Sequence, residues 1–101
     1  MADTQIASHQ SGGILVVEDT PESMKLLTDL LGRAGHSVRQ AQDGELALLT
    51  VRARLPELIL LDINMPGIDG YEVCKRLKAD PATCDVPVIF MSAMQDVDNR
   101  I

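Results

Sequence analysis

The chain has 101 residues and a formal net charge of −6, and 46% of its residues are hydrophobic. This length and composition predict one globular domain rather than a disordered chain, and the acidic balance disfavours direct binding to nucleic acid or to an anionic membrane. No apolar run approaches the roughly 20 residues that cross a bilayer. Cys74 and Cys84 lack the spacing of a metal site and no signal peptide is found, so we expect free thiols in a soluble, cytoplasmic chain.

The chain begins with a polar tail, followed by a strand and a helix. Residues 1–12 are small and polar without periodicity, and we interpret them as a flexible tail. Residues 14–17 are all aliphatic, which predicts a strand buried on both faces. Thr20 and Pro21 suit the N-cap and the first position of a helix, and Gly35 suits its C-cap. The inward face of this helix is predicted from apolar residues at helical spacing: Met24, Leu27, Leu30, Leu31 and Ala34.

The elements after this helix continue to alternate. A short strand is predicted at residues 36–41, a helix at about 45–54 and a second aliphatic strand at 58–61. A third helix is predicted at about 69–79 and a fourth strand at 86–91. This order predicts an α/β fold with a parallel sheet, right-handed crossovers and helices on both faces.

Acidic side chains follow two of the predicted strands. Glu18 and Asp19 come directly after the first strand, and Asp62 comes directly after the third. Because the carboxyl ends of parallel strands meet at one edge of a sheet, we expect these carboxylates to converge, and a hard cation such as Mg²⁺ would neutralise them. The competing interpretation is that they are surface acids that cap a helix or solvate a turn.

These motifs together resemble those of a known family. With Glu18-Asp19, the strand-end Asp62, the continuation Asn64-Met65-Pro66-Gly67 and the strand-end Ser92-Ala93, residues 13–101 resemble the receiver domain of bacterial two-component response regulators. The resemblance implies a flavodoxin-like, doubly wound sheet in the strand order 2-1-3-4-5, truncated here after the fourth strand. It also implies a site at the switch point between the first and third strands.

The same resemblance implies roles for individual residues. Asp62 would accept a phosphoryl group from a histidine kinase or a phosphotransfer protein. Mg²⁺ or Mn²⁺ would be held by Glu18, Asp19, Asp62 and the backbone carbonyl of Asn64, and Ser92 would contact the phosphoryl group. A carboxylate can form a mixed anhydride with phosphorus if its repulsion with the incoming group is neutralised, so the residue types suit this chemistry.

The chain departs from the family's pattern at its carboxyl end. It stops at Ile101, before the lysine and the aromatic residue that receiver domains carry on a fifth strand. We therefore expect an incomplete phosphate clamp and an incomplete output surface. The fourth strand would be a bare apolar edge, so we expect two copies to form a homodimer through it or a further segment to cover it.

Two alternatives stay open. One is a degenerate receiver that works only as a protein-interaction module. The other is an aspartate-nucleophile phosphatase of the haloacid dehalogenase type, which needs an acid two residues after its nucleophile, where this chain has Asn64. This asparagine disfavours turnover, so we expect a regulatory phosphoacceptor rather than an enzyme that acts on a separate substrate.

Overall fold

The structure is a computed structural model that describes residues 12–91. Strands and helices alternate along these residues: β1 (Ile14–Val17), α2 (Pro21–Arg33), β2 (Val38–Ala41), α3 (Gly44–Ala53), β3 (Leu58–Asp62), α4 (Gly70–Ala79) and β4 (Val88–Met91). None of the helices in this part of the chain is long and apolar enough to cross a bilayer. Cys74 and Cys84 are free thiols, as predicted.

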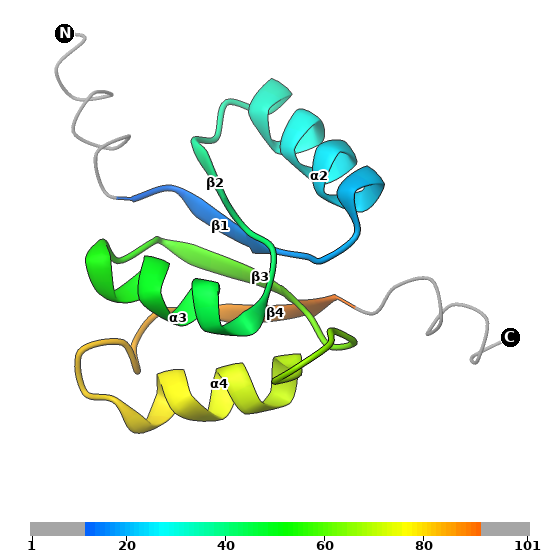
Figure 1. Cartoon of the computed structure of the whole chain (residues 1–101). Coiled ribbons are helices and arrows are strands. Elements are labelled where there is room, and N and C mark those ends of the chain that lie inside the picture. The colour runs from blue at the N-terminus through cyan, green and yellow to red at the C-terminus, as the bar shows by residue number, and fades with distance from the viewer. Residues whose placement is uncertain (1–11, 92–101) are drawn as a thin grey trace, which may run out of the picture.

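The strands form one parallel sheet in the order β2-β1-β3-β4 (Figure 1). This order matches the first four positions of the flavodoxin-like sheet and confirms the predicted fold class. β1 and β3 are direct neighbours, with Val17 beside Leu61, and the last residue of β3, Asp62, lies beside Met91 of β4. The strands therefore end together at one edge of the sheet, which we call the carboxyl edge.

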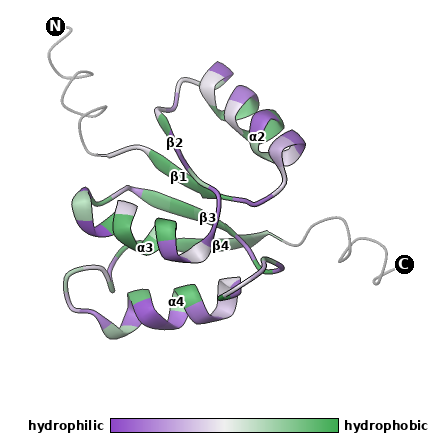
Figure 2. Cartoon of the chain, in the orientation of Figure 1, coloured by the Kyte–Doolittle hydropathy of each residue, from purple (hydrophilic) through white to green (hydrophobic). Residues whose placement is uncertain are grey.

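Helices cover both faces of the sheet. α3 and α4 lie on one face and α2 lies on the other (Figure 1). The side chains of β1 alternate between these layers, because Leu15 and Val17 pack toward α3 and α4 while Ile14 and Val16 pack toward α2. All of β1 is buried, which explains why its sequence has no polar position. Figure 2 shows that β1 and β3, at the centre of the sheet, are hydrophobic, whereas the helices also carry hydrophilic residues.

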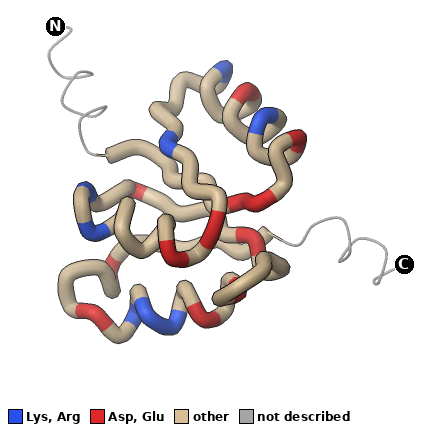
Figure 3. Tube along the Cα trace, in the orientation of Figure 1, with Lys and Arg blue, Asp and Glu red and all other residues tan. Residues whose placement is uncertain are grey.

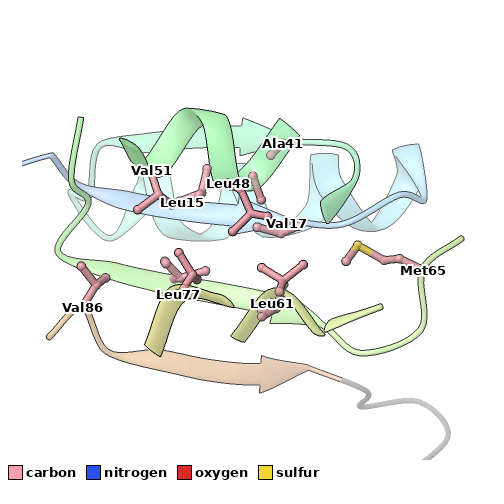
Figure 4. Packing of buried hydrophobic residues seen from close by; sticks show 12 residues of the cluster. Leu15, Val17, Ala41, Leu48, Val51, Leu61, Met65, Leu77 and Val86 are labelled. Atoms are coloured by element: carbon pink, nitrogen blue, oxygen red, sulfur yellow. The ribbon is translucent and has the colours of Figure 1, made fainter. Parts of the chain in front are cut away.

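The larger core cluster fills the space between the sheet and the pair of helices α3 and α4 (Figure 4). Its buried members are Leu15, Val17, Ala41, Ala47, Leu48, Val51, Ile59, Leu61, Met65, Val73, Leu77 and Val86. The inward residues predicted for the second helix, Ala47, Leu48 and Val51, are among them. Met65 comes from the loop after β3, so the core also anchors the chain just beyond Asp62.

The two ends of α2 are formed differently. At its carboxyl end, Gly35 has a φ of +96°, and the backbone N–H groups of Gly35 and His36 donate to carbonyls of the last turn, both at 3.0 Å. This Schellman arrangement favours glycine and matches the predicted end. At the other end Thr20 occupies the N-cap position and Pro21 begins the helix, as predicted, although the Thr20 side chain makes no capping hydrogen bond. Its backbone N–H instead donates to the carboxylate of Glu18.

The predicted inward face of α2 is too wide. Leu30 is 51% exposed and Ala34 is exposed, because α2 turns only a narrow stripe around the buried Met24 toward the sheet.

Two strands begin later than predicted. β2 and β4 begin at Val38 and Val88, two residues later than predicted, because the preceding residues belong to the connections that enter each strand.

Candidate functional site

Glu18, Asp19 and Asp62 lie at the carboxyl edge, where β1 and β3 end side by side (Figure 1). Glu18 and Asp19 directly follow β1, and Asp62 is the last residue of β3. One carboxylate oxygen of each residue lies within 4.8 Å of those of the other two. The parallel pairing of the two strands therefore brings together acids that are far apart in the sequence. We call these three residues the acidic cluster.

Two members of the acidic cluster are held by backbone hydrogen bonds. Glu18 is only 8% exposed and accepts a hydrogen bond from the backbone N–H of Thr20 at 3.1 Å. Asp62 is half-buried, and its Oδ1 accepts from the backbone N–H of Asn64 at 3.1 Å. Asp19 is exposed and faces solvent. The cluster thus combines two oriented carboxylates with one accessible carboxylate.

The surroundings raise the pKa of Glu18 and of Asp62 above their ordinary values. For Glu18 the largest cause is burial, followed among the raising effects by the negative charges of Asp62 and Asp19. For Asp62 burial is again the largest cause, and the charge of Asp19 adds to it. The N–H groups of Thr20 and Asn64 oppose these shifts without cancelling them. Both carboxylates therefore gain from a positive charge placed beside them.

Acidic residues gather around the carboxyl edge, as Figure 3 shows at the β1–α2 junction, at the start of α3 and at the end of β3. Lys25 on α2 is the basic residue nearest to Glu18 and Asp19 along the chain, and its ammonium group pairs with Asp29 at 3.1 Å. A cleft of about 490 Å³ between α2 and β2 includes Glu18 and Asp19 in its lining and opens this side of the cluster to solvent.

The donor set of the acidic cluster fits a hard divalent cation. Three carboxylates within 4.8 Å offer oxygen ligands and more negative charge than their neighbours neutralise. Mg²⁺ typically binds a few carboxylates and keeps several waters, which suits a site with one exposed member. The backbone carbonyl of Asn64 stays a predicted ligand, and Ser92 lies outside the described residues.

One residue beside the acidic cluster was not recognised from the sequence. Gly70, the first residue of α4, donates its backbone N–H to the carbonyl of Ile63 at 3.0 Å. A side chain at this position would overlap the backbone of Asp62. The segment Asp69-Gly70-Tyr71-Glu72 indicates the opening of a helix, and α4 does begin there, but nothing in its pattern shows what lies against the glycine.

The raised pKa values predict an unusual pH dependence when no divalent cation is present. The folded chain holds protons on Glu18 and Asp62 more readily than the unfolded chain, whose ordinary pKa values are 4.5 and 3.8. Their contribution to stability is therefore fully present below those values and is lost as the pH rises through the raised values. Urea midpoints with EDTA should therefore increase as the pH falls from neutral toward these ordinary values, and Asp62→Asn should flatten this trend. Identical slopes in both proteins would contradict the assignment.

Comparison with known proteins agrees with this geometry. The response regulator receiver domain family matches residues 14–101. The response regulator PleD of Caulobacter vibrioides is 42% identical over 91 residues, which cover 90% of this chain and 20% of PleD. The gliding motility regulatory protein of Myxococcus xanthus is 36% identical over 97 residues, which cover 96% of this chain and 12% of that protein. The chain thus spans one fifth or less of the length of these two relatives.

Solved structures show the same fold. The N-terminal domain of a response regulator receiver protein from Methanoculleus marisnigri has a TM-score of 0.77 and 37% identity, covering 85% of this chain and 73% of that one. The receiver domain of a signal transduction histidine kinase from Syntrophus aciditrophicus has a TM-score of 0.74 and 33% identity, covering 86% and 68%. The chain therefore belongs to the response regulator receiver domain family, whose members work in two-component signalling.

Proposed function

We propose that this domain accepts a phosphoryl group on Asp62 from a histidine kinase or a histidine phosphotransfer protein, with Mg²⁺ or Mn²⁺ bound beside it. The observation that carries the proposal is the acidic cluster itself, three carboxylates from the ends of two neighbouring central strands within 4.8 Å of one another. We further propose that the chain acts in the cytoplasm as a regulatory phosphoacceptor, and that nucleic acid and membranes are not its direct partners.

The residues of the acidic cluster have separable roles in this proposal. Asp62 supplies the nucleophile: one carboxylate oxygen forms a P–O bond while the P–N bond of the donor's phosphohistidine breaks and its electron pair stays on the imidazole nitrogen. The N–H of Asn64 holds Oδ1 of Asp62 and thereby fixes the orientation of the carboxylate. The bound cation would offset the repulsion between the negatively charged carboxylate and the phosphoryl oxygens.

The proposal also assigns the remaining contacts to the cation and to the phosphoryl group. Glu18 and Asp19 would hold the cation together with Asp62 and the backbone carbonyl of Asn64. Glu18 is the buried and oriented member, while Asp19 is reached from solvent. Ser92, which directly follows β4, would donate a hydrogen bond to the phosphoryl group.

The test is direct phosphorylation. The full 101-residue chain is incubated with Mg²⁺ and acetyl phosphate, and intact mass spectrometry should show the addition of one phosphoryl group, lost again with hydroxylamine because an acyl phosphate is a mixed anhydride. Peptide mapping should place the adduct on Asp62. An unmodified chain that still binds Mn²⁺ would favour the degenerate interaction module, and rapid multiple-turnover release of phosphate from a small ester would favour the phosphatase.

A further inference from the structure

The first turn of α4 packs directly on the backbone that carries Asp62. The N–H of Gly70 donates to the carbonyl of Ile63 at 3.0 Å. A Cβ atom on Gly70 would overlap the carbonyl oxygen of Asp62 and would lie 2.8 Å from the Cα of Ile63, closer than real Cβ atoms come to other atoms. Gly70 therefore allows α4 to approach the end of β3 more closely than any other residue would.

The requirement for glycine at this position is one of space and not of backbone conformation. Gly70 is not among the described residues with a positive φ, so its backbone suits any L-amino acid. The three atoms nearest to such a Cβ are backbone atoms of Asp62 and Ile63, so no change of side-chain rotamer can relieve these contacts. Either α4 or the end of β3 must shift.

Both partners of this contact are held firmly. Val73 and Leu77 fix α4 because their side chains are 0% and 2% exposed in the core. The end of β3 is fixed by the sheet, where the N–H of Ile63 donates to the carbonyl of Met91 at 3.1 Å. A side chain on Gly70 would therefore press on the carbonyl group of Asp62 itself. It would also strain the connection between these anchors, which carries the Asn64 N–H bound to Oδ1 of Asp62.

We propose that Gly70 is a positioning residue for the acidic cluster: by letting α4 lie against the backbone of Asp62, it sets the place of that carboxylate relative to Glu18 and Asp19. The inference rests on the proposed cation and phosphoacceptor site. Groups that orient metal ligands typically contribute about 10- to 100-fold to metal affinity. The same loss is expected here, because a shifted Asp62 no longer points its oxygen at the shared site.

The experiment measures Mn²⁺ binding to the full chain by the EPR signal of free Mn²⁺. Gly70→Ala should weaken binding by about 10- to 100-fold. The matched control is Gly44→Ala, because Gly44 is likewise the first residue of a helix after an aspartate N-cap and its Cβ would also be crowded. There the nearest atoms belong to the side chains of Ile68 and Val73, at 2.6 Å, and not to the backbone of Asp62 or Ile63. This variant crowds the same layer without pressing on the end of β3, so affinity should stay near wild type. Gly32→Ala, with open space around it, controls for the mutation itself.

The outcomes separate this inference from the function on which it depends. Failure of the wild-type chain to bind Mn²⁺ overturns the proposed site, whereas equal Mn²⁺ affinity of wild type and Gly70→Ala overturns only the role of Gly70. Should Gly70→Ala not fold, hydrogen exchange on the wild type decides. Saturating Mg²⁺ should slow exchange of the Gly70 amide more than that of Ala47, which donates to Asp43 in the first turn of α3. Equal changes at both amides would overturn the proposal.

Discussion

Asp62→Asn is expected to abolish phosphorylation of this chain by acetyl phosphate, reducing the labelling rate by at least about 1,000-fold. The substitution keeps the shape of the side chain and can keep the hydrogen bond from Asn64 to Oδ1, but an amide is not a nucleophile toward phosphorus. It also removes one of the three carboxylates within the 4.8 Å cluster and so weakens the cation site. Intact mass after incubation with Mg²⁺ and donor measures the effect.

A second acid at the same edge provides the control for this prediction. Asp43 caps α3 by accepting from the N–H of Leu46 at 2.8 Å, and asparagine caps helices equally well. Asp43→Asn therefore removes one negative charge near the carboxyl edge while sparing the acidic cluster, and its labelling should match wild type. Asp19→Asn should lie between the two, because it weakens the cation site but keeps the nucleophile. Undiminished labelling of Asp62→Asn would place the acceptor at another residue.

The sequence allowed the sheet and the convergence of acids to be predicted because both follow from strong local signals. Two aliphatic runs, residues 14–17 and 58–61, have no polar position and end in acids, which is typical of buried parallel strands. The rule that ligands bind at the carboxyl ends of such strands then places Glu18 and Asp62 together, and strand pairing in the structure does so. No knowledge of side-chain packing was needed for this step.

Features that depend on tertiary contacts could not be predicted in this way. Helical spacing suggested that Leu30 faces inward, but the width of the buried stripe depends on how α2 crosses the sheet, and Leu30 is 51% exposed. Thr20 occupies the predicted N-cap position, but nothing in the local pattern shows that its backbone N–H donates to the carboxylate of Glu18. The contact of Gly70 with the end of β3 depends on the docking of α4, which is set by residues elsewhere in the core.

The 101-residue chain is expected to self-associate through β4, which is the edge strand of the described sheet. Its Ile89 and Phe90 are 52% and 40% exposed, although the strand is entirely apolar. On the face that α2 covers only in part, Leu58 and Leu60 of β3 are also half-buried. Pairing of two β4 edges would satisfy their unpaired backbone groups and bury this apolar surface, which stabilises association at roughly 25 cal/mol per Å².

Ile89→Lys is the variant that tests this association. A lysine on this edge strand disfavours pairing because its charged head group must stay hydrated beside the second chain, so the dissociation constant should rise by at least about 10-fold. Leu49→Lys makes a similar change on the outer side of α3, where the leucine is 63% exposed, and should leave association intact. Sedimentation velocity distinguishes the species, and a wild-type chain that is a cooperatively unfolding monomer at micromolar concentration would contradict the prediction. A dimer that survives Ile89→Lys but not Leu49→Lys would instead move the contact from the β4 edge to α3.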